Sequence, residues 1–251
     1  MKLLVVAGHG AGDPGAVGFG FTEAERVRAL ASRIKALGGS SVVLGDTSID
    51  WYASGTYNTV NTSMFDATIE LHMDSGVPSA CGGHVIMQSG LDADAYDNNL
   101  ANFLKSYFPG RAEIIKGRND LANPGICARR GINYRLVEVC FITNLEDLTK
   151  FNNNLDTIAK GILSAFGIGA NPNVTPVTPS PAPTPVAKPI SERPEVRFGV
   201  KTLNHGILSQ GVQGKALKSF TSSFSILFKK SFSFSLRCIS FNSSSVYSSY
   251  I

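Results

Sequence analysis

Short apolar runs alternate along residues 1–170 with stretches in which apolar positions recur every three or four residues. The short runs are typical of buried strands, and the periodic stretches are typical of amphipathic helices. This alternation predicts an α/β domain built on a twisted, mostly parallel sheet with helices on both faces. Strands are expected at Leu3–Ala7, Ser41–Leu44, Ala67–Leu71, His84–Gln88 and Tyr134–Phe141.

Three helices complete the pattern. The first begins at Thr22, and the second covers Leu100–Tyr107. The third is expected to run unbroken from Leu148 to Phe166, with Gly167 at its C-terminal end.

The start of the first helix places an acid where an apolar residue is expected. Thr22 and Glu25 fit a capping box, in which Thr22 caps the helix and Glu25 reaches back to it. Glu23 then shares a helix face with Val27 and Leu30. A buried carboxylate needs a partner, because an unpaired buried charge is very unfavourable. Glu23 is therefore a candidate ligand.

Proline divides the chain into parts. Eight of the twelve prolines fall between Pro172 and Pro194, a composition that favours an extended linker and cannot build a core. We therefore expect a first domain over residues 1–169, a Pro/Thr-rich linker over 170–195 and a Ser/Phe/Lys-rich tail over 196–251.

The net charge of +4 comes from the end of the chain. Residues 1–195 carry a net charge of −3, whereas residues 196–251 contain seven basic and no acidic residues. The overall basic balance therefore says nothing about the first domain, which is slightly acidic, and no nucleic-acid partner is expected for it. No apolar run approaches the roughly 20 residues of a membrane helix, so no stable membrane insertion is expected.

A glycine-rich turn follows the first expected strand and contains His9. The segment Gly10–Gly15 fits the letters of a phosphate-binding loop, but Asp13 would repel phosphate and Pro14 lacks an N–H. Nucleotide binding is therefore disfavoured. The alternative is that the glycines allow a sharp turn that presents His9 at the sheet edge as a metal ligand.

His72 lies at the end of another expected strand, and so reaches the same edge. Alternation places Glu70 and His72 on one face of that strand. Together, His9, His72 and Glu23 form a ligand set that is known from catalytic zinc sites with one open position. Glu70 is either a rival ligand or a partner that orients a ligand.

Glu138 is an acid inside an otherwise apolar strand. A general base beside a metal site needs such a carboxylate, held by a rigid element and partly removed from water. The alternative is an ordinary ion pair with Arg129, Arg130 or Arg135.

In this order and spacing, these residues resemble the zinc-dependent N-acetylmuramoyl-L-alanine amidases of the type-3 amidase family, most of all its phage endolysin members. The resemblance covers about residues 1–168. Its motifs are Ala7–Gly10, Asp13–Gly18, Thr22–Ala24, Leu71–His72, Gly131–Glu138 and Phe141–Asn144.

The resemblance implies that His9, Glu23 and His72 bind Zn²⁺ and that Glu138 is the catalytic glutamate. It also implies a substrate, the amide between N-acetylmuramic acid and L-alanine in bacterial peptidoglycan. Two departures stand out. Glu70 occupies a position where the family usually has a small residue, and Cys140 replaces a usual glycine.

Two interpretations of the tail stay open. Its acid-free composition suits a cationic arm attracted to anionic wall polymers or lipid. It also suits a frameshifted tail that truncates a cell-wall-binding domain, because residues 196–208 resemble the opening of such a module. We favour the second interpretation.

The alternative functions are a non-catalytic wall-binding module and a zinc peptidase that cuts within the stem peptide. Retention of Glu138 argues against the first. The apolar run Leu3–Ala7 is too short for a signal peptide. The resemblance therefore implies a protein that waits in the host cytoplasm and reaches the cell wall at lysis.

Overall fold

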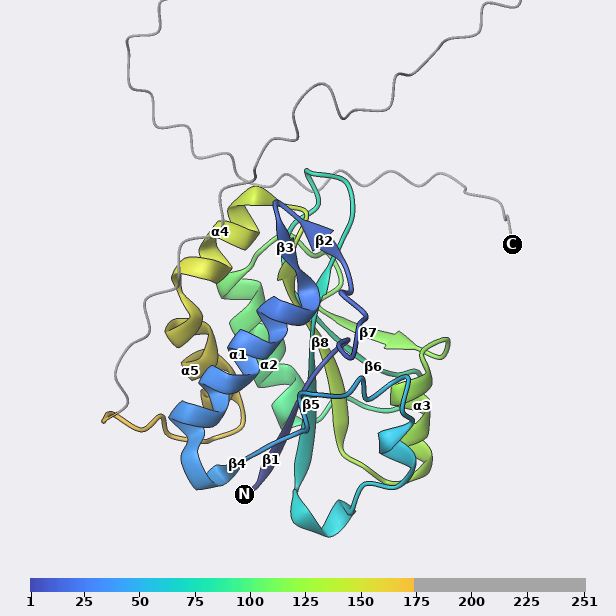
Figure 1. Ribbon diagram of the computed structural model, residues 1–251. Helices are drawn as coiled ribbons and strands as arrows, with labels where there is room; N and C mark the ends of the chain where they lie inside the picture. The colour runs from blue at the N-terminus through green and yellow to red at the C-terminus, as the bar shows by residue number, and fades with distance from the viewer. Residues whose placement is uncertain (174–251) are drawn as a thin grey trace, which may run out of the picture. The chain divides into compact units, whose positions relative to one another are not determined.

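The computed structural model describes residues 1–173 of the 251-residue chain. The predicted tail and almost all of the predicted linker lie outside these residues. A six-stranded sheet forms the centre, in the order β4-β1-β5-β8-β6-β7 (Figure 1). Its strands are β1 (Leu3–Ala7), β4 (Val42–Leu44), β5 (Ala67–Asp74), β6 (His84–Gln88), β7 (Ile115–Arg118) and β8 (Tyr134–Phe141).

The prediction of a mostly parallel sheet is confirmed. Strands β4, β1, β5 and β8 are parallel to one another, and β6 is antiparallel to β8 but parallel to β7. The carboxyl ends of β1, β5 and β8 therefore meet the beginning of β6 at one edge of the sheet. Ligand sites of open α/β sheets form at this edge.

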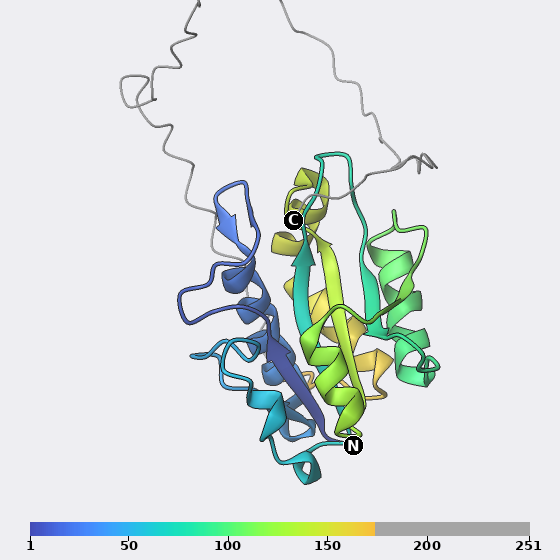
Figure 2. The same cartoon turned by 90° about the vertical axis from the view of Figure 1, so that its right-hand side faces the viewer.

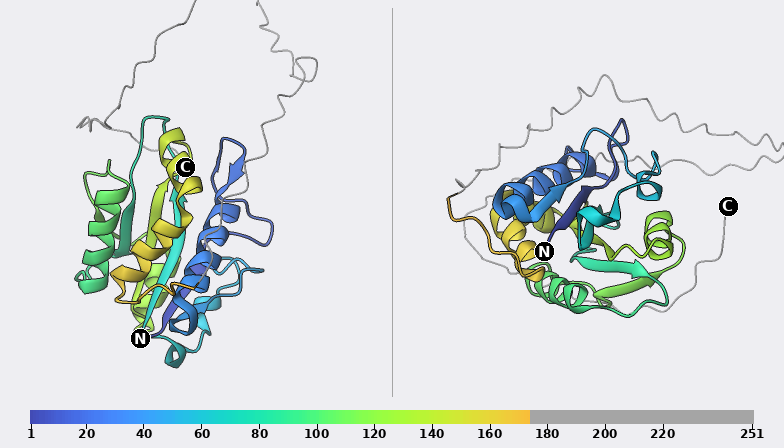
Figure 3. Two further views of the ribbon diagram at one scale, coloured as in Figure 1. Left: turned by 90° about the vertical axis from the view of Figure 1, so that its left-hand side faces the viewer. Right: turned by 90° about the horizontal axis from the view of Figure 1, so that it is seen from below.

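Helices cover both faces of the sheet, as predicted, but unequally (Figures 1 and 3). Figure 2, which is turned by 90° from Figure 1, shows α3 lying in front of the strands. Four helices share one hydrophobic core with the sheet, and α3 belongs to a second core on the opposite face. The helices are α1 (Glu23–Gly38), α2 (Ala95–Tyr107), α3 (Ala122–Arg129), α4 (Leu145–Asn153) and α5 (Leu155–Ala165).

Short elements complete the described part. A small hairpin precedes α1, and three single-turn 3-10 helices lie in the connections around β4 and β5. These elements are β2 (Val17–Gly18), β3 (Phe21–Thr22), η1 (Gly39–Ser41), η2 (Thr56–Asn58) and η3 (Thr62–Met64). No helix within residues 1–173 combines the length and apolar character needed to cross a membrane.

The prediction of one unbroken third helix is wrong. The structure divides it into α4 and α5 at Asn154, whose φ and ψ of −134° and 32° are not helical. The Asn154 side chain donates to the carbonyl of Lys150 at 2.8 Å. Asparagine competes for backbone hydrogen bonds in this way, and three asparagines in succession end the first helix.

Only one of the two hydrogen bonds of the predicted capping box forms at the start of α1. Thr22 accepts a hydrogen bond from the Glu25 N–H at 3.3 Å, as predicted. The Glu25 carboxylate does not reach back, and instead pairs with Arg26.

Candidate metal centre

Glu23 is an acid in the first turn of α1 that retains only 3% of its exposed surface. The backbone N–H of Ala16 donates to its Oε2, and the backbone N–H of Met73 donates to its Oε1, both at 2.9 Å. Thr22 fixes where the helix begins. The helix cap and two backbone donors therefore hold the carboxylate in one orientation, at the carboxyl edge of the sheet.

His9 projects from the turn after β1. Its φ of 59° is left-handed, a conformation that is uncommon outside glycine and needs support from its surroundings. Arg28 on α1 supplies some of that support, because its guanidinium donates to the His9 carbonyl at 2.7 Å. The His9 Nδ1 lies 2.7 Å from Asp13 Oδ2, and its Nε2 lies 3.1 Å from Glu23 Oε1.

His72 reaches the same carboxylate from β5. Its Nδ1 lies 2.9 Å from Glu23 Oε1, and its Nε2 lies 3.1 Å from Glu70 Oε1. Gly8 leaves room for the ring, since a Cβ at Gly8 would overlap the His72 imidazole. The glycine after β1 therefore serves close packing as well as the turn.

The structure brings His9, Glu23 and His72 together, with one ligand atom from each inside a 4.8 Å cluster. A tetrahedral zinc with bonds of about 2.0–2.1 Å separates its ligand atoms by about 3.3 Å. The two nitrogen–oxygen distances of 3.1 and 2.9 Å are close to this value. The donor set and these two nitrogen–oxygen distances are therefore compatible with a bound zinc ion.

Electrostatics also favour a cation at this cluster. Burial alone would raise the pKa of Glu23, but hydrogen bonds from His72 and His9 outweigh it and lower that pKa. Contact with Glu23 raises the pKa of His9. Burial would lower the pKa of His72, but the Glu23 and Glu70 carboxylates raise it well above its usual value. The surroundings of both rings therefore stabilise positive charge.

Glu138 lies beside this cluster on β8, directly opposite His72 on β5. Its Oε2 is buried and has no hydrogen-bond partner within the described residues. The predicted alternative of an ion pair with Arg135 is wrong, because Arg135 donates to Asp97 at 2.8 Å and pairs with Asp94 at 3.1 Å. The glutamate is therefore available for chemistry at the edge.

Burial raises the pKa of Glu138 to about 7, and the Glu23 carboxylate adds to this, although His72 opposes it. A general base works best when its pKa lies near the working pH. Neither of the other two candidate arginines pairs with Glu138 within residues 1–173: Arg130 donates to the Tyr57 carbonyl, and Arg129 is an exposed residue at the end of α3.

Glu138→Gln is expected to stabilise the metal-free domain above neutral pH. Folding raises the carboxyl pKa from 4.5 to about 7, so the ionised form lowers stability progressively as the pH rises between these values. At pH 8 the gain should be on the order of 2–3 kcal/mol. At pH 4 the carboxyl is protonated in both states, and no gain is expected. Urea unfolding in the presence of a chelator measures the free energy of unfolding of both proteins at each pH. An equal gain at pH 4 and at pH 8 would contradict the unfavourable effect of ionising the buried Glu138 carboxyl.

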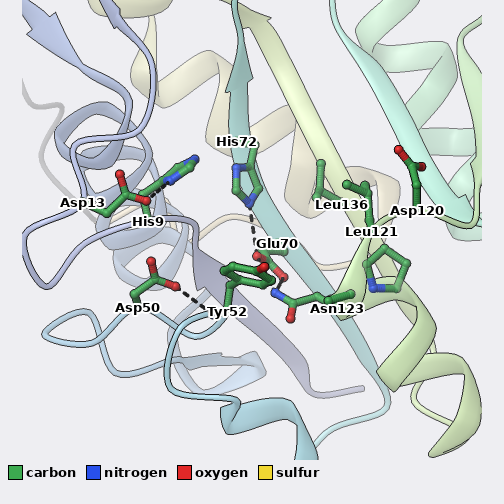
Figure 4. Close-up of a pocket in the computed structure, with 12 residues that line it drawn as sticks. His9, Asp13, Asp50, Tyr52, Glu70, His72, Asp120, Leu121, Asn123 and Leu136 are labelled. Carbon is green, nitrogen blue, oxygen red and sulfur yellow. Dashed lines mark hydrogen bonds and ion pairs between the residues drawn. The ribbon is translucent and has the colours of Figure 1, made fainter. Parts of the chain in front are cut away.

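An open pocket of about 300 Å³ adjoins the cluster (Figure 4). Its walls come from the turn after β1, the segment before η2, the strands β5 and β8, and the first turn of α3. The lining residues are His9, Asp13, Asp50, Tyr52, Glu70, His72, Asp120, Leu121, Ala122, Asn123, Pro124 and Leu136. Both histidines line this pocket, so the pocket opens onto the ligand cluster.

Sequence reasoning missed three contributors to the site. The sequence pattern assigns Asp13 no contact with His9, and it assigns no role to Arg28 or Asn123. The four-residue spacing of His9 and Asp13 could have indicated their contact. No local signal marks Arg28 or Asn123, because their partners lie far away in the chain.

Residues 3–167 match the family model described as N-acetylmuramoyl-L-alanine amidase. The chain belongs to this family. The matched range contains His9, Glu23, His72 and Glu138, so the whole candidate centre lies inside the amidase domain.

A curated relative of the amidase is the probable autolysin PH of Staphylococcus aureus, which is 34% identical over 184 residues. The match covers 66% of this chain and 38% of the autolysin. The chain therefore spans little more than a third of the length of that relative.

Several solved structures share the fold. The catalytic domain of the CD27L endolysin, which targets Clostridia difficile, is 21% identical with a TM-score of 0.54, covering 68% of this chain and 99% of that one. The catalytic domain of CwlV from Bacillus (Paenibacillus) polymyxa is 19% identical with a TM-score of 0.54, covering 66% and 96%. Cwp6 from Clostridium difficile is 20% identical with a TM-score of 0.55, covering 66% and 29%. At these identities, the likeness supports the fold alone.

Proposed function

We propose that the domain hydrolyses the amide between N-acetylmuramic acid and L-alanine in peptidoglycan, and that the activity depends on zinc. One observation carries the proposal. In a chain of the amidase family, His9, Glu23 and His72 converge within 4.8 Å while Glu138 lies opposite His72 on the next strand.

The donor set favours zinc over harder cations. Two imidazole nitrogens and one carboxylate suit zinc, whereas calcium and magnesium prefer oxygen ligands. When bound, zinc supplies Lewis-acid chemistry: it polarises the scissile carbonyl and lowers the pKa of a water molecule.

The proton transfers fall to Glu138. Its carboxylate accepts the proton of the attacking water and passes it to the nitrogen of the departing L-alanine, so that the amide bond breaks to a carboxylate and an amine. Its strand holds it rigidly, and its pKa of about 7 lets it accept and release a proton near neutrality. Its buried Oε2, which has no hydrogen-bond partner among residues 1–173, keeps one acceptor position free for the proton.

The biological setting stays a prediction. We propose a role in lysis of a bacterial host, with the protein in the host cytoplasm before it reaches the wall. The resemblance of the sequence motifs to those of phage endolysins supports this role.

Digestion of purified peptidoglycan tests the activity. Mass spectrometry should find stem peptides that begin with a free L-alanine amino group, and a zinc chelator should abolish their release. New amino termini further along the stem would instead indicate a peptidase. Binding of the wall without any new amino terminus would indicate a non-catalytic module, and activity that survives the chelator would contradict zinc dependence.

A further inference from the structure

His72 is contacted at both nitrogens of its ring. Nδ1 faces Glu23 and the ligand cluster, whereas Nε2 faces Glu70 at 3.1 Å. Glu70 precedes His72 by two residues on β5 and lies on the same face of the strand (Figure 4). A carboxylate therefore stands behind the ring, on the side away from the cluster.

Glu70 is itself held by two further donors. It retains 2% of its exposed surface. The Tyr134 hydroxyl donates to Oε2 at 2.7 Å, and the Asn123 amide donates to both carboxylate oxygens at 3.1 Å. Both donor residues are buried. The contacts fix the position of the carboxylate on three sides: from β5, from β8 and from α3.

Glu70 cannot bind the same ion as Glu23. The two nitrogens of an imidazole direct their lone pairs away from each other, and Glu70 contacts the nitrogen that points away from the cluster. The ligand cluster accordingly contains His9, Glu23 and His72 without Glu70. The geometry favours the orienting role over the rival-ligand role.

We propose that Glu70 is a positioning residue for the zinc centre. By accepting the Nε2–H of His72, it selects the tautomer whose Nδ1 lone pair faces the ion, and it fixes the rotation of the ring. Asn123 and Tyr134 keep Glu70 in place. The inference rests on the proposed zinc dependence. The experiments below can refute the role of Glu70 even where zinc binding itself is confirmed.

Asp13 provides an internal comparison, because it contacts the outer nitrogen of His9 in the same manner at 2.7 Å. The side chain of Asp13 is 50% exposed, whereas that of Glu70 is 3% exposed. Water can replace an exposed partner, and exposed charge pairs contribute little. Loss of the Glu70 carboxylate should therefore weaken the centre more than loss of the Asp13 carboxylate.

The test is the zinc dissociation constant, measured by chelator competition on the full chain. Glu70→Gln keeps the shape and one acceptor oxygen but removes the charge, and should weaken zinc binding about tenfold. Glu70→Ala removes the acceptor entirely, and should weaken binding by up to about 100-fold. Asp13→Asn should have a smaller effect than Glu70→Gln. Asp120 lines the same pocket and forms its ion pair with Arg118. Asp120→Asn should therefore leave the zinc dissociation constant within twofold of the wild type.

Cobalt substitution separates positioning from general destabilisation. The visible absorption of a bound Co²⁺ reports ligand geometry, and it should change in Glu70→Gln at a temperature well below the unfolding transition of both metal-free proteins. A folded Glu70→Gln protein with wild-type zinc affinity and cobalt spectrum would overturn the inference alone. A wild-type protein that binds no zinc would overturn the proposed metal centre and the inference together. If Glu70→Ala does not fold, Glu70→Gln decides the matter.

Discussion

Replacing Glu138 by glutamine is expected to abolish release of stem peptides from peptidoglycan while zinc remains bound. Glutamine keeps the size of the side chain but cannot accept the proton of the attacking water. Loss of a general base typically reduces the rate by 10²- to 10⁴-fold. The ligand cluster of His9, Glu23 and His72 does not include Glu138, so zinc affinity should stay within a few-fold of the wild type.

The measurement pairs the initial rate of dye release from labelled peptidoglycan with the zinc content of the same protein. Glu146→Gln is the matched control, because Glu146 is an exposed acid in the first turn of α4 and should tolerate the change. Undiminished activity of Glu138→Gln would remove the catalytic assignment. Loss of zinc from that variant would instead assign Glu138 to the ligand set.

Replacing His72 by alanine is expected to remove both zinc and activity. Within residues 1–173, His72 supplies one of the three side-chain ligand atoms of the cluster, and the remaining His9 and Glu23 would leave zinc with two protein ligands. Structural and catalytic zinc sites use three or four. The variant should therefore lose zinc during dialysis and hydrolyse peptidoglycan no faster than Glu138→Gln does.

His84→Gln is the control for the loss of a buried histidine. His84 begins β6 opposite Glu138 and lies outside the ligand cluster. Burial lowers the pKa of His84 to about 4, so its ring stays neutral. Its variant should retain zinc. The result that contradicts the assignment is full zinc content in a folded His72→Ala protein. Together, the two large effects separate a ligand, whose loss removes zinc, from a base, whose loss does not.

Most of the fold was predictable because strand and helix signals are local. The five predicted strands all form, since each is a short apolar run that pairs within a buried sheet. Among the strands of the central sheet and the α-helices, the two elements that the sequence pattern does not predict have weak signals. Strand β7 has the sequence Ile-Lys-Gly-Arg, and α3 contains Pro124 and Gly125 near its start. Proline is tolerated in a first helical turn, but no apolar period marks this helix.

The sequence by itself determined which side chains reach the sheet edge. His9 and His72 follow or end strands, Glu23 occupies the apolar stripe of a capped helix, and Glu138 interrupts an apolar strand. Each of these facts depends on neighbours within a few residues. They suffice to place the four residues on elements whose ends meet.

Only the tertiary structure decided how those side chains meet. It set which nitrogen of each ring faces the cluster, Nε2 for His9 and Nδ1 for His72. It also placed Glu70 behind His72 and brought Asn123, 53 residues away in the chain, to hold it. Distances between segments far apart in the chain arise from packing of the whole domain, and no local pattern encodes them.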